Sequence, residues 1–258
     1  MEETGKNPIQ VAERLFQVIE RLAENGPMGI MDLSAELGFH KSTTHRLVTS
    51  LQYMGYIRQD EESLKYALSL KFLEIGSKIL EQTNMASLIH PSLKKLSEQT
   101  GETVHLVRRE GTEAVYIDKV ESTASSIRMV SRVGSRIPLY CSGVGKALLA
   151  ELPDPEIEDI WNSSEITSLT PYTVTSLSDL MDRIRGVREA GYAMDDEENE
   201  EGVRCIAVSI PDYHKEPVYA LSISAPVSRM TDARIAELST DVLTFKKDLE
   251  KTLGFSRS

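Results

Sequence analysis

The spacing of the apolar residues changes at Gly55, and this change most restricts what the N-terminal third can fold into. Residues 7–55 place apolar side chains three or four positions apart in three short stretches, a pattern typical of amphipathic helices. After Gly55 the period is two, in strand-like pieces at 56–58 and 64–66 joined by a polar turn. Three compact helices followed by a hairpin predict a winged helix-turn-helix domain.

The exposed face of the third predicted helix, residues 40–54, indicates DNA binding. If Leu47 lies at the centre of the buried face, a rotation of about 100° per residue points His45 directly away from the core. The face around His45 carries hydrogen-bonding and cationic groups but no carboxylate, which suits the base edges and phosphates of a major groove. An ordinary solvated helix face, the alternative, usually mixes both charge signs. The candidate DNA contacts are Lys41, Ser42, Thr43, His45, Arg46 and Thr49 on the helix, with Arg58 and Lys65 on the wing.

The net negative charge of the whole chain argues against binding of nucleic acid, but the charge is unevenly distributed along the sequence. Lys and Arg number 29 against 40 for Asp and Glu, so the formal net charge is 29 − 40 = −11. Residues 1–80 hold 9 basic and 11 acidic side chains, a net of −2, so the remaining −9 lies outside the N-terminal third. The charge of one helix face, rather than of the whole chain, therefore decides whether the domain can approach DNA.

Composition also bears on where the protein works. Two cysteines form at most one disulfide, which is not the framework of a small secreted domain. The chain opens with no basic and apolar leader, and no apolar run reaches the length of a membrane span. The sequence predicts a soluble, cytoplasmic protein with no membrane association.

A helical pattern continues after the hairpin, with no Ser- or Gly-rich tether. We therefore expect a DNA-binding domain at 1–69, a helical linker at 70–84 and a second domain at 85–258. A stiff linker of this kind can transmit a rotation between domains. The second domain alternates strands and helices, which predicts an α+β fold with an open sheet covered by helices. Its predicted strands are 103–108, 114–120, 126–132, 203–210 and 218–224, and its main predicted helices are 144–151, 177–190 and 231–253.

The last two predicted strands have unequal faces. One face is bulky and apolar, as core packing requires, whereas the opposite face is small and polar. Such a face can leave space for a ligand and supply hydroxyls to hold it, although a helix packed closely over small residues fits the pattern equally well. The small positions are Val203, Cys205, Ala207 and Ser209 on one strand and Val218, Ala220, Ser222 and Ser224 on the other.

A glycine-bearing turn at 141–146 opens a predicted helix. Free backbone N–H groups and the helix dipole converge there, which suits a carboxylate or a phosphate. The turn lacks the first glycine of a P-loop, and Ala147 stands where Ser or Thr should follow Lys146, so nucleotide hydrolysis is excluded. A simple tight turn between a strand and a helix is the alternative.

No constellation of catalytic or metal-binding residues is recognisable. Residues 195–201 contain six acids in seven positions, and we predict a solvated acidic loop, because the glycine and spacing of a calcium loop are missing. The five histidines show no paired metal spacing. Cys205 with His105 or His90 as a base has no supporting spacing, and a small buried thiol is the better interpretation. We expect no cofactor, no metal and no enzymatic activity.

Four ordered stretches, 35–43, 134–149, 195–208 and 221–226, resemble the IclR family of bacterial transcriptional regulators. The resemblance implies an N-terminal winged helix-turn-helix and a C-terminal GAF-like domain that binds a small organic acid. It also implies homodimers through the DNA-binding domains, often joined as dimers of dimers, on double-stranded operator DNA. The effector-binding residues that it implies are Met129, Ile137, Cys141, Gly143, Val144, Asp195, Val203, Cys205, Ser222 and Ser224.

Within the family, the stretches 115–119, 128–132 and 200–205 are most similar to KdgR-type regulators of sugar-acid and pectin catabolism. That likeness implies a repressor responding to 2-keto-3-deoxygluconate. The alternatives are an activator or a regulator that responds to another small keto acid or an aromatic acid. Two further alternatives come from other classes of function. One is an enzyme that acts on a keto acid, and the other is a module that uses the winged helix for protein contacts.

Overall fold

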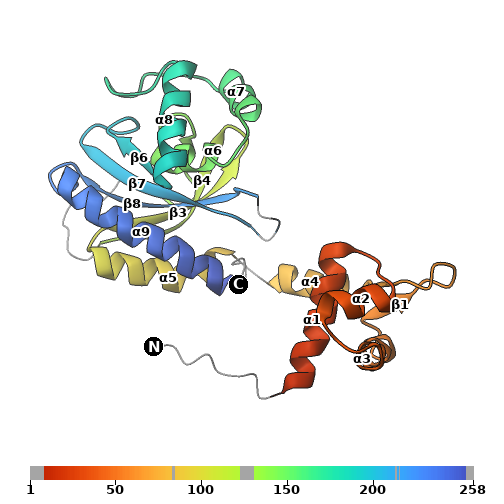
Figure 1. Cartoon of the computed structure of the whole chain (residues 1–258). Coiled ribbons are helices and arrows are strands. Elements are labelled where there is room, and N and C mark those ends of the chain that lie inside the picture. Colours follow the sequence, from red (N-terminus) through yellow and green to blue (C-terminus); the bar gives the residue numbers. More distant parts are fainter. Residues whose placement is uncertain (1–8, 83–84, 123–130, 213, 215, 254–258) are drawn as a thin grey trace. The chain divides into compact units, whose positions relative to one another are not determined.

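The computed structural model describes residues 9–82, 85–122, 131–212, 214 and 216–253, and the chain divides into two compact units (Figure 1). Unit 1 spans residues 1–84 and unit 2 spans residues 85–258. Each unit contains its own hydrophobic core.

Unit 1 is a winged helix-turn-helix, as the change of period predicted. Its core joins Val18 and Leu22 of the first helix to Leu33, Leu47 and Leu51 of the next two, and every one of these side chains is buried. Gly38 ends the second helix in the left-handed region, at φ 65°, and this turn sets the third helix across the second. The elements are α1 (Gln10–Asn25), α2 (Ile30–Leu37), α3 (Lys41–Tyr53), β1 (Ile57–Gln59), β2 (Tyr66–Leu68) and α4 (Lys71–Gln82).

The wing hairpin differs from the predicted one in the position of its second strand. β2 begins at Tyr66 rather than Leu64, and Ile57 pairs with Leu68. Leu64 has a φ of 58°, so it belongs to the turn, and its side chain is exposed. The Asp60 carboxylate accepts from the amide and hydroxyl of Ser63, which forms the first half of this longer turn.

Unit 2 is built on a six-stranded antiparallel sheet in the order β5-β4-β3-β8-β7-β6. The mixed α+β prediction is therefore confirmed. The strands are β3 (Thr103–Glu110), β4 (Glu113–Val120), β5 (Arg136–Pro138), β6 (Ala193–Asp196), β7 (Val203–Ile210) and β8 (Tyr219–Pro226). The helices are α5 (Met85–Thr100), α6 (Gly143–Leu149), α7 (Asp154–Asn162), α8 (Leu177–Ala190) and α9 (Asp232–Thr252).

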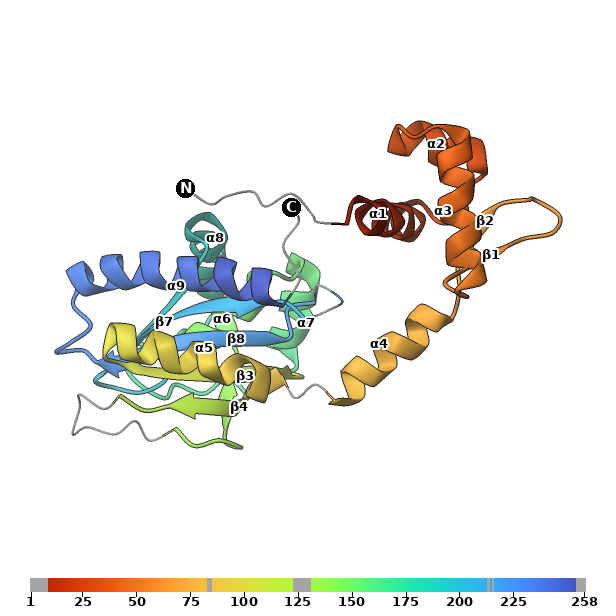
Figure 2. The same cartoon turned by 90° about the horizontal axis from the view of Figure 1, so that it is seen from below.

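Helices cover both faces of this sheet, and the two faces differ as the strand alternation predicted. α5 and α9 lie side by side over the bulky face (Figures 1 and 2), where Leu93 and Leu238 pack with Ile206, Leu221 and Ile223. α6 packs on the small face against β7 and β8, and α8 contacts α6 and β6. The helix over the small residues confirms close packing there without excluding a ligand beside it.

Two edge strands, β5 and β6, were not predicted. Each has only three or four residues, and β6 contains two aspartates, a residue type that strands disfavour. Their strand conformation comes from pairing with β4 and β7, which periodicity within the segment cannot reveal. Of the strand predicted at 126–132, residues 126–130 lie outside the described part of the chain, and 131–132 are not in a strand.

Candidate functional site

The candidate DNA-contacting face lies on α3. Thr44, Leu47, Val48 and Leu51 are its buried positions, so the opposite side of the helix faces solvent. Lys41, Ser42, His45, Arg46 and Thr49 are all exposed, and Thr43 is half-buried. The first turn of α3 contains no acidic residue. The N-terminal end of this helix is therefore positive, because of the helix dipole, its unpaired N–H groups and the Lys41 ammonium.

Buried polar contacts hold α3 in place against α2. The hydroxyls of Ser34 and Thr44 lie 3.0 Å apart, and both side chains are buried. Ser34 donates to the carbonyl of Ile30, and Thr44 lies 3.4 Å from the carbonyl of His40. The exposed face of α3 therefore has a defined orientation within unit 1.

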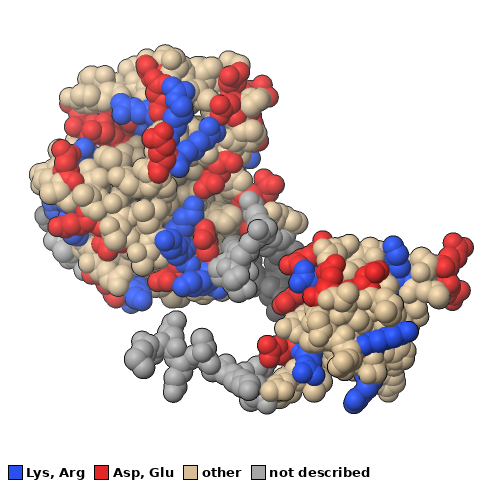
Figure 3. Space-filling view, in the orientation of Figure 1, with Lys and Arg blue, Asp and Glu red and all other residues tan. Residues whose placement is uncertain are grey.

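The wing combines cationic sides with an acidic tip. Arg58 on β1 and Lys65 just before β2 are exposed, as the sequence predicted for phosphate contacts. Asp60, Glu61 and Glu62 are also exposed, and acidic side chains gather at the end of the hairpin (Figure 3). Repulsion between these acids and phosphate should keep the tip, though not the sides, away from the DNA backbone.

In unit 2, the strand register brings five of the predicted effector residues together. Cys205 pairs with Asp195 on one side and with Ser224 on the other, so these three side chains form one row across the small face. Ser222 occupies the next row, opposite Ala207. Gly143 lies above them, since a Cβ on it would be 3.4 Å from the amide nitrogen of Asp195 and 3.5 Å from the Cβ of Ala207.

His105 on β3 belongs to the same face and was not predicted as a site residue. It pairs with Ser222, and its Nδ1 lies 3.4 Å from the Ser222 hydroxyl and 3.3 Å from that of Ser224. Its Nε2 lies 2.7 Å from the hydroxyl of Ser131. Burial, with Lys119 nearby, lowers the pKa of His105 to about 3, so its ring is neutral. The alternation of residues along 103–107 could have placed His105 on one face of a strand. The sequence could not show that this strand pairs with β8, which brings His105 next to the two serines.

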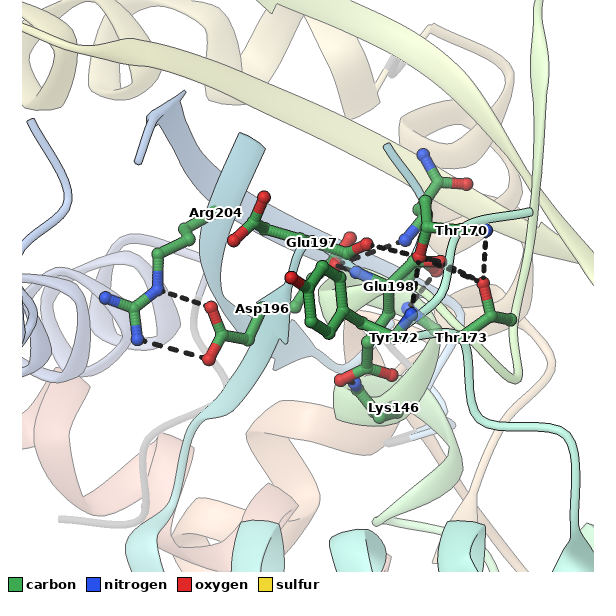
Figure 4. A network of polar contacts seen from close by, with 12 residues as sticks. Lys146, Thr170, Tyr172, Thr173, Asp196, Glu197, Glu198 and Arg204 are labelled. Carbon is green, nitrogen blue, oxygen red and sulfur yellow. Dashed lines mark hydrogen bonds and ion pairs between the residues drawn. The ribbon is translucent and has the colours of Figure 1, made fainter. Parts of the chain in front are cut away.

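The acidic run is only in part the solvated loop that we predicted, since Asp196 and Glu201 are exposed but two of its acids are buried. Asp195 and Glu198 are only 4% and 3% exposed, and Glu198 forms an ion pair with the equally buried Lys146 of α6 (Figure 4). The Asp195 carboxylate accepts from the amides of Glu198, at 2.8 Å, and Asn199, at 3.3 Å. The dense negative charge suggested exposure, but a lysine on a distant segment lets the turn fold inward.

Two threonines fix the same turn from outside it. The hydroxyl of Thr170 donates to the carbonyl of Glu197 at 2.6 Å, and that of Thr173 donates to the carbonyl of Glu198 at 2.6 Å (Figure 4). Glu197 itself has a φ of 61°, a strained conformation for a residue with a side chain. Because these contacts define the backbone after β6, they also fix the position of the Asp195 carboxylate.

The titrating groups of the small face are shifted towards their neutral forms. Burial is the largest cause, and it raises the pKa of Asp195 to about 7 and the pKa of Cys141 to about 12. The pKa of the Cys205 thiol is raised as well, again mainly by burial. A thiol kept protonated is a poor nucleophile, which agrees with the expected absence of cysteine catalysis.

The raised pKa of Asp195 predicts a pH dependence of stability. Between its ordinary value of 3.8 and about 7, the folded chain holds a proton that the unfolded chain releases. This contribution to the free energy of unfolding is complete below the lower value and is lost as pH rises through the window. Asp195→Asn keeps an oxygen for the two amides, so it should remove this slope and be more stable than the parent at pH 8 by roughly 1–3 kcal/mol. Urea unfolding at a series of pH values checks this, and equal slopes in the two proteins would contradict it.

The remaining predicted effector residues have different positions. Ile137, Cys141 and Val144 are buried within the hydrophobic cluster between α6 and the sheet, and Val203 begins β7 half-buried. Met129 lies outside the described residues. A cavity of about 440 Å³ lies elsewhere, between α8 and β6, and Lys146 and Glu198 line its end.

The described residues contain neither a membrane-spanning helix nor a cluster of metal-binding side chains. Within the ranges that the structure covers, no helix is long and apolar enough to cross a membrane. The same residues contain no group of three or more His, Cys, Asp or Glu side chains placed to hold a metal ion.

Known proteins are similar to this chain in both sequence and fold. Residues 11–61 match the IclR helix-turn-helix domain, and residues 77–250 match the C-terminal domain of the bacterial transcriptional regulator IclR. The chain is 36% identical over 252 residues to the acetate operon repressor of Salmonella typhimurium, covering 96% of this chain and 92% of that protein. It is 35% identical over 252 residues to the regulator KdgR of Escherichia coli, covering 97% and 95%. The crystal structure of Thermotoga maritima IclR aligns with a TM-score of 0.63 at 31% identity, over 95% of this chain and 99% of that one.

A winged helix with an acid-free recognition face, linked to a domain with a small polar sheet face, defines a DNA-binding transcriptional regulator with an effector-binding domain. Its matched domains and relatives are regulators rather than enzymes. The chain belongs to the IclR family of bacterial transcriptional regulators. KdgR is one of several relatives at about the same identity, so identity alone does not select an effector.

Proposed function

We propose that this protein represses a carbohydrate or sugar-acid catabolic operon in the cytoplasm and responds to a small organic acid, with 2-keto-3-deoxygluconate favoured. The observation that carries the effector proposal is the row Asp195, Cys205, Ser224, with Ser222 beside it and Gly143 above it. Serine hydroxyls and backbone amides can donate to a carboxylate, while a carboxyl group such as Asp195 accepts from ligand hydroxyls. The KdgR-type resemblance supports a keto sugar acid.

In this proposal, the first turn of α6 binds the effector carboxylate. The N–H groups of Gly143 and Val144 belong to that turn and have no acceptor within the helix. Ser222 and Ser224 donate to effector oxygens from the sheet, and the Asp195 carboxyl group accepts hydrogen bonds from the effector's hydroxyls. Met129, Ile137, Cys141, Val203 and Cys205 complete the proposed effector set.

Effector binding would then shift the protein between two states of different operator affinity. A ligand achieves this only to the extent that it binds one state more tightly than the other. A near-neutral reading domain implies modest affinity for each copy, so we propose that a homodimer, within a dimer of dimers, binds the operator. Ser42, His45 and Arg46 would contact bases or nearby phosphates, and Lys41, Arg58 and Lys65 would position the DNA backbone, with Thr43 and Thr49 in the same interface.

The DNA-binding part is tested by a mobility-shift assay on the region upstream of the protein's own operon. His45→Ala should weaken binding by about 10- to 100-fold, because a contact to a base edge is worth about 1–3 kcal/mol. The matched control is His90→Ala, which changes an exposed histidine of unit 2 that is paired with Asp118. Equal affinities for parent and His45→Ala, with folding intact, would remove His45 from the interface. The absence of salt-dependent DNA binding would favour a module that uses the winged helix for protein contacts.

The effector part is tested by thermal-shift screening of three classes of acid: keto sugar acids, simple keto acids and aromatic acids. A ligand present at 100 times its dissociation constant stabilises the folded state by about 2.7 kcal/mol, which amounts to several degrees. We expect stabilisation by 2-keto-3-deoxygluconate and weaker effects from pyruvate and benzoate. Stabilisation by aromatic acids alone would reject the sugar-acid proposal, and turnover of a keto acid would indicate an enzyme.

A further inference from the structure

The strongest unassigned feature of the small face is the polar cluster around His105. The ring is 2% exposed and lies in the middle of the sheet, on β3, between β4 and β8. Three serine hydroxyls lie within hydrogen-bond distance of its two nitrogens, Ser131 at Nε2 and both Ser222 and Ser224 at Nδ1. The two latter hydroxyls also lie 3.4 Å from each other.

The directions of the hydrogen bonds in this cluster depend on the tautomer of His105. A neutral imidazole has one N–H donor and one bare acceptor nitrogen. If Nδ1 is bare, it accepts a hydrogen bond from one of the two serines, and that hydroxyl can no longer donate to a ligand. If Nδ1 carries the proton, it donates to a serine oxygen, and the hydroxyl protons of the pair stay available. Only the second tautomer therefore leaves both serines free to donate to the carboxylate of an effector.

Ser131 provides a reason for that second tautomer to be favoured. Its hydroxyl lies at the short distance of 2.7 Å from Nε2 and can donate to a bare Nε2. The carbonyl of Ser131 accepts from the Lys119 ammonium at 2.9 Å, which holds the residue beside the ring. The nearby Lys119 charge and the burial of the ring also oppose a second proton on the imidazole.

We propose that His105 is a positioning residue for effector recognition, and that its Nδ1–H tautomer, held by Ser131, makes Ser222 and Ser224 hydrogen-bond donors to an anionic effector. The inference rests on the proposed function, since it concerns the same site. It adds a residue that contributes through the serines rather than through its own contact with the ligand. It also specifies the ligand chemistry, namely an acid with acceptor oxygens towards β8.

Two substitutions separate the two nitrogens of the ring. The side-chain amide of Asn reaches about as far as Nδ1, whereas that of Gln reaches about as far as Nε2. His105→Asn therefore keeps a donor towards Ser222 and Ser224, and His105→Gln keeps a polar group only towards Ser131. We expect His105→Gln to weaken binding of 2-keto-3-deoxygluconate by about 10- to 100-fold, and His105→Asn to weaken it clearly less. Titration calorimetry measures both affinities, and operator affinity without the acid, together with the melting temperature, confirms that each variant is folded.

The outcomes are distinguishable. Unchanged affinity in both variants, or equal losses that follow the loss of melting temperature, would overturn the positioning role and leave the proposed function standing. If the unsubstituted protein binds none of the acids, the proposed function fails and the inference fails with it. Should neither variant fold, nitrogen-15 NMR of the unsubstituted protein with 2-keto-3-deoxygluconate decides. A proton on Nδ1 supports the proposal, and a proton on Nε2 overturns it.

Discussion

Substituting Gly145 by alanine should abolish the native packing of unit 2. A Cβ at this position would lie 2.2 Å from the carbonyl oxygen of Leu139 and 2.3 Å from its Cα. These are backbone atoms of a buried segment, so no rotation of a side chain can relieve the overlap, and α6 would have to move off the sheet. We expect Gly145→Ala to lower the free energy of unfolding by more than about 4 kcal/mol, a loss that marks severe steric conflict. Urea unfolding, or the soluble yield if the variant does not fold, measures it.

The matched control is Gly186→Ala in α8. Apart from its chain neighbours and the backbone of α8 itself, no atom of the described residues lies within 4 Å of a Cβ built on Gly186, which is exposed on the helix. Alanine should therefore be neutral there or stabilising by up to about 1 kcal/mol, because it favours the helix. A Gly145→Ala variant as stable as Gly186→Ala would show that α6 can shift freely. It would also weaken the argument that Gly143 has a fixed position over the small face.

Breaking the buried ion pair should have the second largest effect. The side chains of Lys146 and Glu198 are 1% and 4% exposed, and one Glu198 oxygen, Oε2, is buried with no hydrogen-bond partner among the described residues. Lys146→Met would leave the Glu198 carboxylate buried and uncompensated close to Asp195, whose ionised form Lys146 also favours. Removing one partner of such a pair costs about 3–5 kcal/mol. We expect a loss of that size in chemical denaturation, together with weaker effector binding because the turn after β6 loses its anchor.

Two further variants make this prediction specific. Lys146→Met combined with Glu198→Leu removes both charges and should recover most of the lost stability, because apolar pairs can replace buried ion pairs. Lys94→Met breaks a solvent-exposed pair with Glu98, in which the side chains are 65% and 66% exposed, and should cost less than about 0.5 kcal/mol. If Lys146→Met cost no more than Lys94→Met, the ion pair could not be what holds the acidic run inward.

The Gly145 and Lys146 results bear on one sequence motif, the glycine turn at 141–146. Its spacing indicated an anion-binding turn or a simple tight turn, and one of its two glycines has a packing reason in the structure. Gly145 allows the helix to touch the backbone of Leu139, whereas a Cβ on Gly143 would make ordinary van der Waals contacts with Asp195 and Ala207. Lys146, which resembled a phosphate-binding lysine, neutralises a buried glutamate instead. Free amides in the first turn of α6 remain compatible with a carboxylate ligand.

Features that depend on short-range periodicity could be predicted from the amino-acid sequence. Three helices and a hairpin, an acid-free face on α3, and the bulky and small faces of β7 and β8 all follow from patterns within about 15 residues. Such patterns are reliable because burying one face of a helix or strand requires apolar residues at its own repeat. The residues of α3 that point to solvent were predicted correctly for the same reason.

The contacts between residues of distant segments could not be predicted and follow from the fold. His105 joins Ser222 and Ser224 because β3 pairs with β8, across a separation of more than one hundred residues. Glu198 of the acidic run is buried because Lys146, 52 residues away, supplies the opposite charge. β5 and β6 became strands only through their neighbours. A charge or an edge strand is stabilised by its partner, and the sequence near such a residue contains no record of where that partner lies.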